Sequence, residues 1–290
     1  MFVRVFCIAL ITLLAACADA PVTPPDPAQT PVRFLLTFDD GPSLAEKIYS
    51  TRDILDTLRD NPIQPGIKAL FFVQPRVPGA GASAEGQGLL QRSFAEGHLL
   101  GLHSGSSEGH LNHCSMSDAD LRASLVDGNN AIAAITGKAP LLIRPPYWDY
   151  NQRTLAAYAD NGLTMLLTDI SANDGKIKGF IASFSRRGHM RDGLRQVRAD
   201  IAAGVLPSDN GVIPVVVTFH DTNSYTAQHM PEYLSILVEE AAAVGLRVSE
   251  QPFYADRSEL EQAALLRAND ISHRAKMVPG YWSWLWHSEQ

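Results

Sequence analysis

Apolar runs of strand length alternate with helix-like segments along most of this chain of 290 residues. The expected strands are Arg33–Phe38, Lys68–Val73, His98–His103, Leu141–Arg144, Thr164–Thr168, Val212–Phe219 and a short one at Leu246–Val248. The expected helices include Leu44–Arg59, Ser117–Ile135, Gln152–Asn161, Ala227–Ala243 and Arg257–His273. Such alternation predicts an α/β fold with a parallel sheet, closed into a barrel. With 46% hydrophobic residues the chain can bury one large core, so we expect a single domain at residues 33–290.

The first 32 residues do not follow this pattern. Residues 1–16 carry one positive charge, Arg4, and then an apolar run and small residues, which is typical of a secretory signal peptide. The segment Leu14-Ala15-Ala16-Cys17 resembles the processing box of bacterial lipoproteins, which implies cleavage before Cys17 and lipidation of that cysteine. Five prolines between Pro21 and Pro31 predict an extended tether at residues 17–32.

The charge and the cysteines narrow the class of protein further. Loss of Arg4 with the signal peptide would change the formal net charge from −7 to −8. A mildly acidic chain without a basic block argues against nucleic-acid binding. If Cys7 is removed with the signal peptide and Cys17 is lipidated, Cys114 has no cysteine to pair with. We therefore expect an ordinary apolar core rather than a disulfide framework.

Polar clusters follow five of the expected strands. The first is the pair Asp39-Asp40, which ends an apolar run and precedes Gly41-Pro42. The other clusters are His103-Ser104 with His110 and His113, Arg144-Pro145-Pro146-Tyr147, Asp169 through Asp174-Gly175, and Thr218-Phe219-His220-Asp221. Because parallel strands end at one edge of a sheet, these clusters should converge on one face of the barrel. Adjacent acids on an extended segment point in different directions, so one can hold a metal while the other faces a substrate.

In their order and composition, these clusters resemble the motifs of the NodB-type polysaccharide deacetylases, the fourth carbohydrate esterase family. The resemblance spans about Arg33 to Val248 and is closest in Thr37-Phe38-Asp39-Asp40-Gly41-Pro42 and in Arg144-Pro145-Pro146-Tyr147. It implies a distorted (β/α) barrel of about seven parallel strands, the NodB homology domain. It also implies an enzyme that removes N- or O-acyl groups from sugars with one divalent metal, usually Zn²⁺.

The resemblance also implies roles for individual residues. Asp40, His103 and a second histidine would bind the metal, and this ligand set leaves positions open for water and a substrate oxygen. Asp39 would be the general base and His220 the general acid that protonates the leaving amine. The remaining roles are orientation of Asp39 by Arg144, orientation of His220 by Asp174 or alternatively Asp169, and stabilisation of the oxyanion by the backbone N–H of Tyr147.

The second histidine ligand is harder to place, because members of the family usually carry it four residues after the first. Here that position is Ser107, and the next histidines are His110 and His113. In the family, the second ligand stands about six residues before a helix start that Met116–Leu121 resembles here. Since His110 lies six residues before Met116, we favour His110 within a loop lengthened by three residues, with His113 as the alternative.

Two departures concern the wall of the acyl pocket. This chain has Gly175 after Asp174, where the family usually has Trp, and Thr218 before His220, where it usually has Leu. The pocket should be roomier or more polar, unless Trp148 or a tryptophan of the tail Tyr281–Trp286 replaces the missing groups. We expect the tail to pack over a barrel face, with sugar stacking or membrane contact as alternatives.

We therefore expect a metal-dependent hydrolase that removes N-acetyl groups from amino sugars of a cell-envelope or extracellular polysaccharide or oligosaccharide. The alternatives are a deformylase or O-deacetylase acting on a lipid-linked sugar, and a non-catalytic glycan-binding lipoprotein. Its expected partners are a glycan and a membrane, the latter through lipidated Cys17. Ala18 rather than Asp after that cysteine favours the outer membrane, facing the periplasm, if the cell has one.

Overall fold

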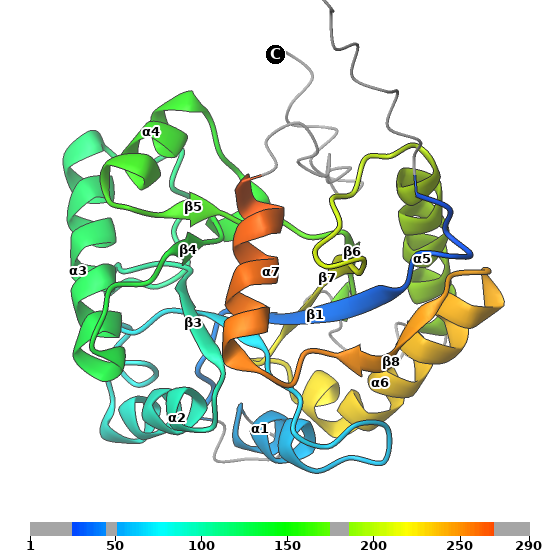
Figure 1. Cartoon of the computed structure of the whole chain (residues 1–290). Helices are drawn as coiled ribbons and strands as arrows, with labels where there is room; N and C mark the ends of the chain where they lie inside the picture. Colours follow the sequence, from blue (N-terminus) through cyan, green and yellow to red (C-terminus); the bar gives the residue numbers. More distant parts are fainter. Residues whose placement is uncertain (1–24, 45–50, 175–185, 270–290) are drawn as a thin grey trace, which may run out of the picture.

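The computed structural model describes residues 25–44, 51–174 and 186–269. Seven strands pair side by side in the order β5-β4-β3-β2-β1-β7-β6, and an eighth, β8, pairs with β1 (Figure 1). All these pairings are parallel. The strands are β1 (Val32–Asp39), β2 (Leu70–Val73), β3 (Leu99–Leu102), β4 (Leu142–Ile143), β5 (Thr164–Met165), β6 (Ile170–Ser171), β7 (Ile213–His220) and β8 (Val248–Phe253). The order ends at β5 and β6 among the described strands, so the sheet is a curled half-barrel, consistent with the expected distorted (β/α) barrel.

Helices follow most strands and pack around the sheet (Figure 1). They are α1 (Thr51–Arg59), α2 (Ala84–Ala95), α3 (Asp118–Thr136), α4 (Gln152–Asp160), α5 (Arg186–Ala202), α6 (Ser224–Ala243), α7 (Arg257–Asn269) and the short 3-10 helix η1 (Pro146–Trp148). Helix α3 shows why such a segment begins and ends where it does. The Ser117 hydroxyl accepts the backbone N–H of Asp120, and Gly137 ends the helix at a φ of 80° that favours glycine.

The two faces of the sheet pack against different helices, because successive side chains of a strand point to opposite faces. Phe34, Leu36 and Phe38 of β1 belong to the core shared with helices α1 to α6. Leu35 lies on the other face, in a second core with Leu260 and Ala264 of α7. Helix α7 therefore packs on the concave side of the curled sheet, where Figure 1 shows it crossing β1.

The same concave face carries polar side chains at the far ends of the strands. Thr37 and Asp39 share the face of Leu35, and they are paired in register with Thr218 and His220 of β7. Thus α7 covers the half of this face where the strands start, and the polar half lies at their carboxyl ends. This division places the chemistry-bearing side chains at one mouth of the barrel.

Most expected elements are present, with some shifts and omissions. The strand expected at Leu246–Val248 is instead β8 at Val248–Phe253, and α2, α5 and β6 were not expected. Three predicted features lie outside the described residues: the signal peptide with Cys17, the first part of the tether, and the aromatic tail. The search for a helix long and apolar enough to span a bilayer found no such helix within residues 25–44, 51–174 and 186–269.

Candidate active site

Three side chains from two loops, one after β1 and one after β3, converge as a candidate metal centre. Asp40, His103 and His110 each offer one ligand atom, and these atoms lie within 4.8 Å of one another. Asp40 Oδ1 is 3.1 Å from His103 Nε2 and 3.4 Å from His110 Nε2. Asp40 follows β1 with a left-handed φ of 76°, which turns its carboxylate away from the direction that Asp39 takes at the strand end.

Hydrogen bonding around His103 tests whether this set fits a cation. His103 Nδ1 lies 2.8 Å from the backbone carbonyl of Arg144, which can only accept, so this nitrogen carries the proton. In the neutral ring Nε2 is then a lone pair, and it is buried with no hydrogen-bond partner among the described residues. A lone pair that faces a carboxylate oxygen across 3.1 Å needs a positive charge between them. The donor set therefore fits a divalent metal held by one carboxylate and two imidazoles.

The charge states of two of these groups agree with metal binding. Burial raises the pKa of Asp40, but in the metal-free protein its hydrogen bond and attraction to the protonated form of His103, with the charges of His110 and His220, outweigh burial and bring the pKa to about 2. A bound metal would take the place of that proton on His103 Nε2. Burial and the charges of His103 and His220 lower the pKa of His110 despite the attraction of Asp40. An ionised carboxylate and a neutral imidazole are the protonation states that a metal requires.

Arg144 holds Asp39 in the polar half of the concave face of the sheet. The guanidinium is fully buried, and its Nη1 donates to Asp39 Oδ1 at 2.8 Å and to Thr37 Oγ1 at 2.6 Å. Its other nitrogens donate to the carbonyls of Leu166 and Leu167. With five donors in a rigid fork, this arginine fixes the direction in which the carboxylate of Asp39 can accept a proton.

Across the sheet, Asp174 holds His220. His220 Nδ1 lies 2.7 Å from Asp174 Oδ1, and the backbone N–H of His220 donates to Asp174 Oδ2 at 2.8 Å. Burial lowers the pKa of His220, but the hydrogen bond and charge of Asp174, aided by Asp39 and Asp40, raise it to about 9. The ring is thus cationic at neutral pH in the metal-free protein, with Nε2 left to donate a proton.

Asp169, the alternative candidate for orienting His220, contacts other residues instead. Its carboxylate accepts the backbone N–H of Val216 and pairs with Arg267 of α7. Asp169 thus joins α7 to the sheet and makes no described contact with His220. Arg267 stands 98 positions further along the chain, so this partner could not be read from the motif.

The structure separates the two histidines that competed for the second ligand position. His110 is in the candidate metal centre, whereas His113 Nδ1 lies 2.8 Å from the Tyr158 hydroxyl in a buried site. Burial, with the charges of His103 and His110, lowers the pKa of His113 to about 3, so it is neutral. Gly109, at a φ of 86°, supplies the turn before His110.

The expected acyl wall has an altered composition in the described residues. The Thr218 hydroxyl is 2.9 Å from the Thr37 hydroxyl, so the polar group that stands in place of a leucine is already hydrogen-bonded. The Trp148 ring lies 4.9 Å from the Arg144 guanidinium, at the edge of the site. Gly175 and the aromatic tail lie outside the described residues, and so does any contribution from them.

Two further polar residues lie near the site: sequence reasoning missed Gln74, and it named Asp221 in the cluster with His220 without giving it a role. Gln74 directly follows β2 and donates to the Asp40 carbonyl at 3.1 Å; its position at a strand end was the available signal. Asp221 is buried, accepts the Thr51 hydroxyl at 2.7 Å, and has its pKa raised to about 7, mainly by burial. A Cβ at Gly41 would lie 2.0 Å from Asp221 Oδ2, which explains why a glycine follows the two aspartates.

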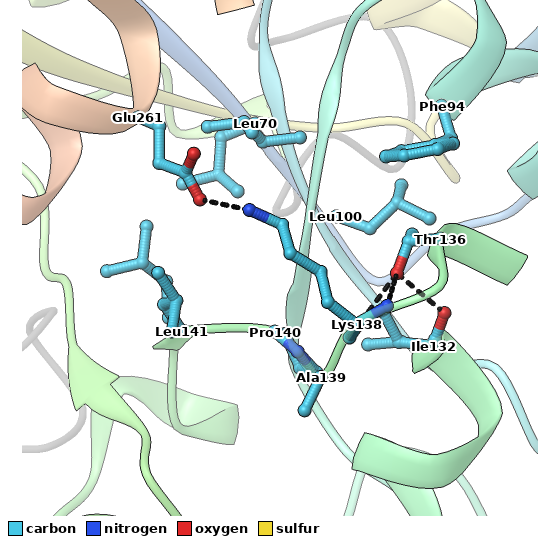
Figure 2. A pocket seen from close by; sticks show the side chains of 12 residues that line it. Leu70, Phe94, Leu100, Ile132, Thr136, Lys138, Ala139, Pro140, Leu141 and Glu261 are labelled. Atoms are coloured by element: carbon cyan, nitrogen blue, oxygen red, sulfur yellow. Dashed lines mark hydrogen bonds and ion pairs between the residues drawn. The ribbon is translucent and has the colours of Figure 1, made fainter. Parts of the chain in front are cut away.

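A hollow at the opposite end of the strands can be set aside as a substrate site. Figure 2 shows it lined by apolar side chains such as Leu70 and Leu141, with Lys138 reaching across to Glu261. The Lys138 Nζ to Glu261 Oε1 distance is 3.0 Å. Its cavity of about 30 Å³ has room for roughly one water molecule. It is therefore a packing gap beside α7 rather than a pocket for a sugar.

Comparisons with known proteins relate part of this chain to one family. Residues 27–166 match the family model for polysaccharide deacetylase. A chitin deacetylase of Pestalotiopsis sp is 31% identical over 144 residues, which cover 50% of this chain and 44% of that protein. The peptidoglycan-N-acetylglucosamine deacetylase PgdA of Listeria monocytogenes is 31% identical over 152 residues, which cover 52% of this chain and 28% of that protein. The chain thus spans less than half the length of these two relatives.

Solved structures agree on the fold. The chitin deacetylase from Colletotrichum lindemuthianum has a TM-score of 0.58 at 21% identity, covering 78% of this chain and 87% of that one. The family 4 carbohydrate esterase from Streptomyces lividans has a TM-score of 0.53 at 23% identity, covering 75% and 92%. Residues 27–166 of this chain therefore match the polysaccharide deacetylase family, and its fold is the one found in these two solved structures.

Proposed function

We propose that this protein is a metal-dependent hydrolase that removes N-acetyl groups from amino sugars of a polysaccharide or oligosaccharide. The observation that carries the proposal is the register pairing of Asp39 with His220 beside the candidate metal centre. One residue of this pair is an anion held by Arg144 and the other is a cation held by Asp174. A base and an acid that face one site are what amide hydrolysis requires.

A divalent cation bound by Asp40, His103 and His110 would lower the pKa of a bound water and polarise the acyl carbonyl. Asp39 takes a proton from the attacking water, and Arg144 keeps its carboxylate oriented. The backbone N–H of Tyr147 donates to the developing oxyanion. His220 then gives the proton on Nε2 to the amine of the sugar, which leaves poorly without it, while Asp174 retains the proton on Nδ1.

The names of the relatives support an amino-sugar substrate. Those proteins are a chitin deacetylase and a peptidoglycan-N-acetylglucosamine deacetylase, and both names denote N-acetylated glycans. We extend that substrate class to this chain and take zinc as the metal, because two imidazoles and one carboxylate suit zinc.

The test is acetate release by the zinc-loaded protein from acetylated chito-oligomers and from peptidoglycan, with acetylated xylan as the O-acetyl arm. Asp39→Asn should abolish release while zinc affinity stays within about twofold, and the exposed Asp192→Asn serves as the matched control. Glycan binding without acetate release would support a non-catalytic binding protein instead. Release from xylan alone would show that the N-acetyl assignment is wrong.

We also propose that lipidated Cys17 anchors the protein to the outer membrane, on the periplasmic side. The position of the N-terminal part of the chain supports this proposal. The chain is held at the start of β1, where the backbone N–H of Val32 donates to the Arg247 carbonyl. The catalytic Asp39 lies at the other end of that strand, about 23 Å away at ~3.3 Å per residue. An anchor at the N-terminus would thus hold the site away from the membrane. Incorporation of labelled palmitate that is lost in Cys17→Ser would support it, and labelling unchanged in that variant would refute it.

A further inference from the structure

The loop that carries His110 has little backbone structure to hold that histidine in place. Near it, the backbone bonds are Gly109 N–H to the Ser106 carbonyl at 3.2 Å and Leu111 N–H to the Gly109 carbonyl at 2.9 Å. His110 is also partly exposed, with a side-chain accessibility of 33% against 3% for His103. A ligand on such a loop pays the entropy of ordering when it binds a metal, unless other groups order it beforehand.

The segment after β4 supplies such groups. The Tyr147 hydroxyl donates to the backbone carbonyl of His110 at 3.2 Å, and the two rings lie 4.3 Å apart between centroids. Two residues further along each segment, Asn112 Nδ2 donates to Asp149 Oδ2 at 2.8 Å. The histidine loop and the turn at η1 are thus joined at two points, one at the ligand itself and one two residues after it.

The Tyr147 side chain is not part of the core, because it is 61% exposed. Both of its contacts given for the described residues are to His110. Its backbone has a φ of 61°, a conformation that tyrosine adopts at a cost, and this conformation orients the side chain. An exposed aromatic residue at this cost needs a function other than packing.

We propose that the Tyr147 side chain is a positioning residue for the metal ligand His110, which it orders through one hydrogen bond and one ring contact. This inference rests on the proposed function, because it takes His110 as a ligand. It is separate from the role of the Tyr147 backbone N–H, which every side-chain substitution retains. The competing use of an exposed aromatic ring is a platform on which a sugar stacks.

A positioning role and a sugar-stacking role of Tyr147 predict changes in different measured quantities. A positioning residue alters the affinity of the protein for the metal alone, with no glycan present, whereas a stacking platform alters only the KM for the glycan. Partners that orient a metal ligand typically change metal affinity about 10- to 100-fold when removed. Loss of one hydrogen bond with the ring retained should cost about fivefold.

The experiment measures Zn²⁺ affinity of the full chain by competition with a chromogenic chelator after removal of metal with EDTA. The variants are Y147A, Y147F and H110A, with V126A as the matched control, because Val126 is also an exposed large apolar residue, 45% accessible, and lies on α3. Thermal melts of the metal-free proteins establish that each variant folds, and Y147F keeps the test valid should Y147A fold poorly. Visible spectra of the Co²⁺-loaded proteins report directly on ligand geometry.

The expected result is an affinity about 10- to 100-fold weaker for Y147A and about fivefold weaker for Y147F, a changed Co²⁺ spectrum for Y147A, and no change for V126A. Wild-type affinity in Y147A and Y147F with a raised KM for acetylated chito-oligomers would assign Tyr147 to sugar stacking and overturn the inference. Failure of the wild type to bind Zn²⁺, or full affinity in H110A, would instead overturn the metal centre of the proposed function, and the inference with it.

Discussion

The pair His220–Asp174 makes a quantitative prediction about stability in the metal-free protein. Against the effect of burial, Asp174 as the main contributor, with Asp39 and Asp40, raises the pKa of His220 from 6.5 to about 9, and an unfolded chain restores the ordinary value. The folded state therefore binds one more proton than the unfolded state between these two values. The free energy of unfolding contributed by this pair is fully present below pH 6.5 and declines as the pH rises to about 9. The slope is about 1.4 kcal/mol per pH unit, so the total loss is about 3 kcal/mol.

The perturbation that isolates this contribution is Asp174→Asn. The amide oxygen can still accept the His220 backbone N–H and the Thr226 hydroxyl, as Asp174 Oδ2 does at 2.8 Å and 2.6 Å. The amide nitrogen then faces His220 Nδ1, which must become an acceptor, so the neutral ring with its proton on Nε2 is favoured. We expect the pKa of His220 to fall by about two units.

The assay is urea unfolding of the EDTA-treated wild type and variant from pH 6 to 9.5, with the pKa of His220 followed by NMR of its Cε1–H. The difference between the two stability curves should be about 3 kcal/mol at pH 6 and should shrink toward pH 9.5. The control Glu232→Gln removes a carboxylate that lies 3.2 Å from His229 at the surface, and it should cost less than about 1 kcal/mol. A pH-independent difference, or a wild-type His220 that titrates near 6.5, would refute the reasoning.

Three further predictions follow from the same contacts. His110→Ala should abolish Zn²⁺ binding measured by calorimetry and His113→Ala should spare it, and the reverse would show that the ligand assignment is wrong. Arg144→Met should lower the free energy of unfolding by about 3–5 kcal/mol in urea, since it leaves the carboxylate of Asp39 buried and unpaired; a loss below 1 kcal/mol would contradict this. Gly41→Ala should lower the melting temperature and adding Asp221→Ala should restore part of the loss, because the new Cβ meets that carboxylate; equal melting of the single and double variants would count against it.

Much of the candidate site could be predicted from the sequence because strand ends are local features. Asp39, His103 and His220 each stand at or just after an apolar run, and parallel strands bring such positions to one edge. Side chains alternate along a strand, so the sharing of one face by Leu35, Thr37 and Asp39 also follows from the pattern alone. The fold could be anticipated for the same reason.

Helix α5, strand β6 and the partner of Asp169 could not be predicted from the sequence. Either the partner lies far away in the chain, or charged residues obscure the apolar periodicity. Helix α5 buries Met190, Leu194, Val197 and Ile201 at helical spacing, but arginines surround these positions and obscure the amphipathic period. Strand β6 has two residues, and its partner β7 lies more than 40 positions further along the chain, so no local periodicity marks it. The pairing of Asp169 with α7 is a contact of the same long-range kind.

The different roles proposed for Asp39 and Asp40 follow from the backbone rather than from their chemistry, which is identical. Asp39 ends β1, so strand alternation places its carboxylate on the concave face, beside Arg144. If Asp40 continued the strand it would point to the opposite face, toward the helices that cover the sheet. Its left-handed φ of 76° instead turns the carboxylate to His103 and His110. That conformation costs roughly 1 kcal/mol in a residue other than glycine, and a cation held between Asp40 and the two imidazoles would offset this cost. The chain therefore reaches this turn at a residue that can bind the metal, and the glycine follows one position later, where Asp221 leaves no space for a Cβ.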